Sequence, residues 1–229
     1  MGSTWSGACA FAIQTSITYL SQTGALGKTN KEVAVSEKYN SLVTPAGYAF
    51  AIWGVIFSWE GVMVVRQLLK PTVNPSFQLC WISANVFQSL WSFAFAQESM
   101  ISSSVLLSGI AASLYGCVAH AEDQSFGWVR GPISLHAGWV TVAALLNYNL
   151  CLVKFEERMS TQWVAAKLTI AVATVAALGM LWFKKDVMFA SSIAWALAAV
   201  KDASWPAGIV GAGIAAALAS DLSDLVVKK

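Results

Sequence analysis

Residues 40–59, NSLVTPAGYAFAIWGVIFSW, indicate the fold class of this chain. The stretch passes from a polar loop through Pro45 into a long apolar segment. A proline is compatible with a helix start, because its missing N–H would have no intrahelical partner there. Phe50, Trp53 and Phe57 then follow at positions i, i+3 and i+7, which share one face of a helix. The spacing predicts a helix that enters a membrane with an aromatic face.

The composition of the whole chain is typical of a membrane protein. Of its 229 residues, 57% are hydrophobic and only 11% are charged, whereas about a quarter of the residues in a soluble domain are charged. Its apolar runs approach the roughly 20 residues that a helix needs to cross a hydrocarbon core. The sequence therefore predicts an all-α, multi-pass integral membrane protein in a lipid bilayer. Plastid, mitochondrial and plasma membranes all stay open, and so does the orientation, because Lys and Arg are divided evenly between the two sides.

Charge and cysteine content argue against several classes of function. The net charge is +2 without a basic cluster, so nucleic acid is not an expected partner. The four cysteines lie in apolar segments without paired spacing, so we interpret them as small buried hydrophobic residues. No nucleophile–base pair, phosphate-binding loop or metal-ligand cluster stands out. We expect a non-enzymatic protein without a metal site.

The apolar segments predict seven or eight membrane spans. The first loop, residues 21–46, is long for a connection between helices, and loops of that length are often lids or binding elements. The last two apolar segments are of marginal spanning length. The expected spans are about 4–20, 47–69, 77–97, 101–119, 133–153, 163–183, 187–200 and 206–220.

Two segments resemble a known membrane protein family. Residues 17–57, ITYLSQTGALGKTNKEVAVSEKYNSLVTPAGYAFAIWGVIF, resemble the entry of the tryptophan-rich sensory proteins, relatives of the translocator protein (TspO/MBR) family. Residues 132–149, PISLHAGWVTVAALLNYN, are similar to that family's pattern of proline, tryptophan, alanine and a Leu-Asn…Asn ending. Asn85 and Trp91 resemble a further pattern, an asparagine followed by a tryptophan. The resemblance covers roughly residues 10–155.

The resemblance implies a five-helix core with a cavity under the first loop. The core would occupy residues 1–155, and residues 156–229 would add two to three further transmembrane helices, as in the longer branch of the family. Family members bind tetrapyrroles such as protoporphyrin and haem, and some bind sterols. The motif positions that match are Pro45, Phe50, Trp53, Asn85, Trp91, Pro132, Trp139, Ala143, Leu146 and Asn147.

The chain departs from the family pattern in its first loop and in the span that follows Pro132. Shorter members have a Lys-Pro-x-Trp and a double proline in that loop, where this chain has Glu37-Lys38-Tyr39 and the single Pro45. His136 stands where longer relatives tend to show tyrosine. Because of these departures, the porphyrin contacts that the family makes through this loop are not expected to carry over directly to this chain.

A ligand site is expected between the first loop and spans one, two and five. A porphyrin site needs rings for stacking and polar groups at its rim, although apolar stripes of this kind usually serve helix packing. The candidate ligand-binding residues are Tyr48, Phe50, Trp53, Phe57, Asn85, Trp91, His136, Trp139 and Asn147.

Ionisable residues inside the expected spans are candidate functional groups. His136 is a candidate axial ligand to haem iron or chlorophyll magnesium through one ring nitrogen, and a hydrogen bond to a neighbouring group is its simpler interpretation. A charge at the position of Glu60 costs roughly 2.5–3.5 kcal/mol at a helix centre. It therefore needs a proton, water or a partner, and Lys167 and His136 are the candidate partners, either in a buried ion pair or in a proton relay.

Three functions stay open at this stage. The first is a binding protein for a tetrapyrrole or a similar flat apolar ligand, such as porphyrin, haem, a sterol or a chlorophyll-type pigment. The second is a structural or pigment-associated subunit of a larger photosynthetic or respiratory membrane complex, or a homodimer. The third is a small-molecule transporter with a polar path around Glu60.

Overall fold

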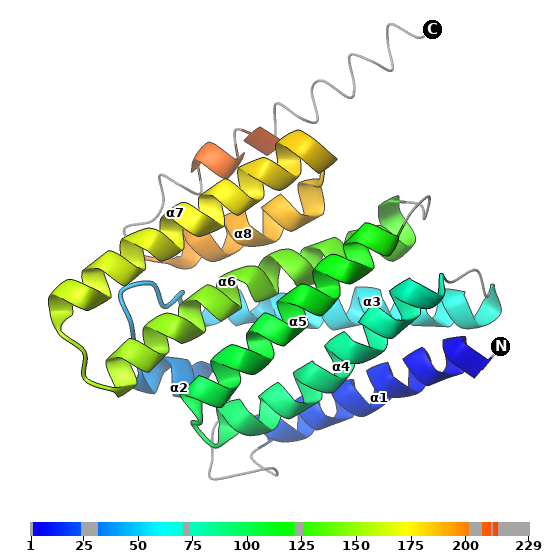
Figure 1. Cartoon of the computed structure of the whole chain (residues 1–229), viewed down its shortest axis with the longest axis horizontal. Coiled ribbons are helices and arrows are strands. Elements are labelled where there is room, and N and C mark those ends of the chain that lie inside the picture. Colours follow the sequence, from blue (N-terminus) through cyan, green and yellow to red (C-terminus); the bar gives the residue numbers. More distant parts are fainter. Residues whose placement is uncertain are drawn as a thin grey trace, which may run out of the picture.

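The computed structural model describes residues 2–23, 32–70, 74–121, 126–201, 208–211 and 213–214, and its long elements in these ranges are all helices (Figure 1). One isolated β-bridge joins Pro45 to Val200. The elements are α1 (Gly2–Gln22), α2 (Glu32–Lys38), η1 (Gly47–Ala51), α3 (Ile52–Leu69), α4 (Pro75–Ala96), α5 (Met100–His120), η2 (Phe126–Arg130), α6 (Gly131–Lys154), α7 (Met159–Lys184) and α8 (Val187–Ala199).

Among the residues described, four helical segments are long and apolar enough to cross a membrane, which confirms the prediction of a multi-pass membrane protein. They are Gly47–Leu69, Met100–His120, Trp128–Lys154 and Met159–Lys184. At 21 and 22 residues, α1 and α4 reach a similar length, but they are not among the segments whose hydropathy suits a membrane span.

Polar side chains join α1 to α4. Thr18 Oγ1 lies 3.2 Å from Ser92 Oγ, and Gln14 donates a hydrogen bond of 2.9 Å to Thr18. All three side chains are buried. Hydrogen bonds of this kind satisfy polar groups between membrane helices, and they explain why the first predicted span is polar.

The C-terminal region differs from the predicted seven or eight spans. α8 has 13 residues and is about 20 Å long, which is shorter than the roughly 30 Å hydrocarbon core. It is therefore a short apolar helix, not a span in its own right. The predicted eighth span, 206–220, lies largely outside the described residues. The proposed division of the chain after residue 155 stays a prediction.

α6 is the central helix of the bundle (Figure 1). It contacts α3, α5, α7 and α8, and 61% of its spanning window is buried, against 28% for α7. A Cβ atom at Gly138 would lie 2.1 Å from Ser192 Oγ and 2.4 Å from the carbonyl oxygen of Phe189. Glycine at this position therefore lets the backbones of α6 and α8 approach closely.

The first loop contains a helix and is fastened at its end. Helix α2 lies at the end of the bundle where α5 begins and α6 ends (Figure 1). Pro45 does not start the following helix. It pairs instead with Val200, and the N–H of Ala46 donates a 2.9 Å hydrogen bond to the carbonyl of Ala199. Because of these contacts, the loop is held against the end of α8, and the chain enters α3 through the 3₁₀ turn η1.

Candidate functional site

An aromatic cluster lies in the interior of the bundle. The ring centroid of Trp53 lies 5.2 Å from that of Phe57, 6.1 Å from that of Trp91 and 6.0 Å from that of Trp139. Phe50 lies edge-on to Trp139 at 5.9 Å. Stacked and edge-on pairs stabilise by about 0.5–1.5 kcal/mol beyond the burial of their area. The cluster therefore joins η1, α3, α4 and α6 through their rings.

A small cavity adjoins this cluster beneath α2. It encloses about 20 Å³, which is room for about one water molecule. Ser36 lines it from α2. The other lining residues are Phe50, Trp53, Trp91, Phe95, Leu107, Trp139, Ala143, Leu146, Asn147 and Leu150. Pockets for small ligands usually measure roughly 300–1,000 Å³, so the cavity is closed in this conformation.

Four of the nine expected ligand-binding residues do not line the cavity. Phe57 and His136 contact the ring of Trp53, whereas Tyr48 and Asn85 lie away from the aromatic cluster. Tyr48 is 58% exposed, and its ring is 5.5 Å from that of Trp195, edge-on. Asn85 turns back on its own helix and donates a 2.8 Å hydrogen bond to the carbonyl of Trp81. Neither side chain lines the cavity.

The cavity wall includes residues that the sequence did not indicate. Phe95 stacks on Trp91 at 5.2 Å, one helical turn further along α4. This i, i+4 spacing is visible in the sequence, so the contact between Trp91 and Phe95 could have been predicted from it. Leu107 of α5 carries no such signal, because it is an ordinary apolar residue in an apolar helix. α5 therefore supplies part of the wall, whereas none of the described residues that line the cavity comes from α1, which was expected to contribute.

Asn147 belongs to a hydrogen-bond network between α5 and α6. Its Nδ2 donates to Ser104 Oγ at 2.7 Å and to the carbonyl of Met100 at 3.0 Å, and its Oδ1 accepts from Ser103 Oγ at 2.9 Å. Trp91 Nε1 donates to the same Ser103 hydroxyl at 2.9 Å. Both amide protons of Asn147 are thus used within the protein. The network holds one wall of the cavity in place.

A buried carboxyl–imidazole pair lies beside the aromatic cluster. His136 Nδ1 is 2.7 Å from Glu60 Oε1, and the two residues are 4% and 1% exposed. His136 also lies edge-on to Trp53 at 5.5 Å. The structure thus places His136 next to Glu60, whereas Lys167 lies on α7 and lines a different cavity.

Two ring nitrogens in this region have no hydrogen-bond partner within the described part of the chain. They are Nε2 of His136 and Nε1 of Trp139, and both are buried. The contact with Glu60 at Nδ1 orients the imidazole and leaves Nε2 open. A carboxylate often orients a ligating histidine in this way. Orphaned buried polar atoms are uncommon, so water or a ligand is expected at these nitrogens.

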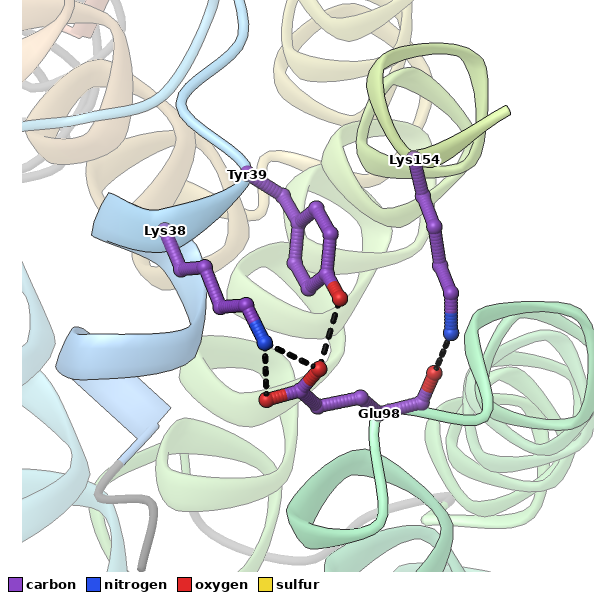
Figure 2. Close-up of polar contacts among 4 residues, drawn as sticks. All are labelled: Lys38, Tyr39, Glu98 and Lys154. Carbon is purple, nitrogen blue, oxygen red and sulfur yellow. Dashed lines mark hydrogen bonds and ion pairs between the residues drawn. The ribbon is translucent and has the colours of Figure 1, made fainter. Parts of the chain in front are cut away.

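Helix α2 is fastened over the cavity by four residues that we call the Glu98 latch: Lys38, Tyr39, Glu98 and Lys154 (Figure 2). Lys38 Nζ donates to both carboxylate oxygens of Glu98, at 2.8 and 2.6 Å, and the Tyr39 hydroxyl donates to one of them at 2.6 Å. Lys154 Nζ donates to the Glu98 carbonyl. The latch therefore ties α2 to the turn between α4 and α5 and to the end of α6.

The charges of the latch reinforce one another. Hydrogen bonds from Lys38 and then from Tyr39 hold the pKa of Glu98 below its ordinary value of 4.5. The hydrogen bond to Glu98 raises the pKa of Lys38 above its ordinary 10.5. Both groups are consequently charged at neutral pH, and the latch is closed there.

Comparison with known proteins identifies the family to which the chain belongs. The sequence matches the model of the TSPO-like protein family over residues 4–220. The chain belongs to the TSPO-like protein family. No significant match was found among curated proteins or among solved structures. TSPO-like proteins are known for binding porphyrins and other small apolar ligands. The match runs beyond the residues that carried the resemblance and includes α7 and α8.

The departure in the first loop now has a structural counterpart. Where shorter TSPO-like proteins have their Lys-Pro-x-Trp motif, this chain has Lys38 and Tyr39, which bind Glu98 in the latch. In this member of the TSPO-like family, the loop is thus anchored by an ion pair and a phenol.

Proposed function

We propose that the chain is a non-enzymatic membrane protein that binds a flat apolar ligand of the tetrapyrrole class beneath α2. The supporting observation is the convergence of Phe50, Trp53, Trp91 and Trp139 on one buried cavity. Aromatic faces stack well on a flat conjugated ring, and a mostly apolar pocket with few polar groups is typical of such sites. The function known for the TSPO-like family agrees with this proposal.

Ligand entry requires the cavity to open. A volume of about 20 Å³ does not hold a tetrapyrrole, so a ligand must displace α2, the rings or both. Displacement of α2 is the smaller change, because α2 is a seven-residue helix held at its C-terminal end by the latch. A carboxylate on the ligand edge can replace Glu98 as the acceptor for Lys38 and Tyr39.

The orphaned nitrogen of His136 favours a metal-bearing ligand. Neutral imidazole ligates haem iron through one nitrogen, and Nε2 is the nitrogen left open by the contact with Glu60. His136 does not line the cavity but lies edge-on to Trp53, which does, so an axial bond from Nε2 would require an opening that extends past the Trp53 ring. Haem should bind more tightly than metal-free protoporphyrin, and a His136→Gln variant should lose this preference.

Titration with protoporphyrin tests the site. Trp53→Ala removes the ring at the centre of the cluster, so we expect affinity to fall by up to about tenfold, since stacking of one ring on the ligand contributes about 0.5–1.5 kcal/mol and about 1.4 kcal/mol corresponds to tenfold. Trp182→Ala is the matched control, because Trp182 is 80% exposed on α7. The porphyrin absorbance band reports binding independently of tryptophan fluorescence. Equal affinity in Trp53→Ala and Trp182→Ala would remove this site from consideration.

A further inference from the structure

A second and larger cavity lies on another face of the protein. It is a groove of about 750 Å³ along α7, bounded by Leu42 of the first loop and by Lys201 after α8. α7 is the least buried of the four candidate spans, at 28%. The groove therefore lies on the helix with the largest share of surface left for lipid, and it is separate from the cavity beneath α2.

The groove is cationic at one end and apolar at the other. Trp163 and Lys167 lie near the start of α7, one turn apart on one face. Ile170, Ala171 and Val175 continue the same side toward the middle of the helix. A tryptophan near a helix end is typical of the level of the lipid headgroups, so the apolar end reaches into the hydrocarbon.

Among the described residues, the two lysines of the groove have no anionic partner. Within the described part of the chain, neither Lys167 nor Lys201 forms a hydrogen bond or ion pair, and none of the described residues that line the groove is acidic. Lys167 lies roughly 12 Å into α7. A lysine at that depth is costly unless its ammonium reaches the interface or meets an anion.

We infer that the groove binds an anionic phospholipid of the surrounding bilayer. The phosphate group lies between Lys167 and Lys201, and one acyl chain follows the apolar side past Ala171. The arrangement of the groove, two cations above an apolar channel, is complementary to an amphiphile with an anionic head. A bilayer lipid is the occupant that this lipid-facing helix meets at the highest concentration.

Native mass spectrometry of the full chain in detergent tests this inference with phosphatidylglycerol and phosphatidylcholine. Phosphatidylglycerol should bind more tightly. Each lysine near a bilayer surface contributes a factor of about five in affinity for anionic lipid, so Lys167→Gln with Lys201→Gln should weaken binding by roughly 30-fold. Arg158→Gln removes the same charge at the same end of α7, on an exposed residue outside the groove, and should leave the preference unchanged.

A steric variant gives an independent test with both lysines kept. Ala171→Trp fills the channel and should abolish the preference for phosphatidylglycerol, whereas Val172→Trp places the same ring outside the groove and should not. Equal binding of the two lipids, or an equal loss in Arg158→Gln, would overturn the inference. Binding of oleate without binding of phosphatidylglycerol would also overturn it, because the occupant would then be a free fatty acid.

Discussion

Replacing His136 with leucine is expected to lower the free energy of unfolding by about 3 kcal/mol, because removing one partner of a buried pair leaves the other uncompensated. Glu60 is 1% exposed, and His136 is the partner that the structure gives its carboxyl group. Denaturant or thermal unfolding of the purified protein in detergent measures the loss.

Two further variants distinguish the loss of the Glu60–His136 pair from a general effect of removing a histidine. His120→Leu removes the exposed histidine at the end of α5 and should change the stability by less than about 0.5 kcal/mol. Glu60→Leu combined with His136→Leu removes both polar groups and should recover part of the stability. The pairing would be refuted by a His136→Leu protein as stable as His120→Leu.

Replacing Glu98 with glutamine is expected to open α2. The change removes the carboxylate charge that accepts hydrogen bonds from Lys38 and Tyr39, and the loss of one charge-assisted hydrogen bond corresponds to roughly a tenfold change in an equilibrium constant. Ser36 is 2% exposed beneath the latch. A cysteine introduced at Ser36 should therefore react with a thiol reagent about tenfold faster in Glu98→Gln, as measured on the peptide that contains it.

The matched control for the latch is Glu157→Gln, a carboxylate at the same end of the bundle that is exposed and lies outside the latch. It should leave the labelling rate unchanged.

The latch has a predicted pH range. Because the folded pKa of Glu98 is depressed, its contribution to the stability of the closed latch is complete above pH 4.5 and is lost as the pH falls through the lowered pKa. Because the folded pKa of Lys38 is raised, its contribution to the closed latch is complete below pH 10.5 and is lost as the pH rises through the raised pKa. A tenfold faster reaction of Glu157→Gln would contradict the latch. The thiolate is the reacting form of cysteine, so every labelling rate rises with pH, and the second contradicting result is a ratio of the Glu98→Gln rate to the parent rate that falls to one between pH 6 and 9.

The sequence predicted the membrane class and the aromatic centre because both depend on local spacing. Trp53 and Phe57 stack as their i, i+4 positions require. Contacts between residues far apart in the chain could not be predicted from local spacing. Glu60 meets His136 across 76 positions of the chain, and Lys167 was an equal candidate until the helices were arranged. The Glu98 latch was missed for the same reason, since it joins residues about 60 positions apart.

Local backbone geometry accounts for the residues that lie elsewhere than expected. Asn85 was expected to bind a ligand, but its amide bonds the carbonyl one turn back, an arrangement that sequence does not distinguish from an inward-facing amide. Tyr48 belongs to the 3₁₀ turn η1, whose three-residue period places its ring outside the cluster. Phe50, which lies three residues before Trp53 in the same turn, keeps the predicted face and lines the cavity.

The most direct test of a ligand site beneath α2 is an experimental structure of the full chain with bound protoporphyrin. The account predicts ligand density against Trp53 and Trp139, with α2 moved away from Glu98 and Lys38 turned toward the carboxylates of the ligand. Ligand density confined to the groove of α7, with Ser36 still closing an empty cavity of about 20 Å³, would contradict it.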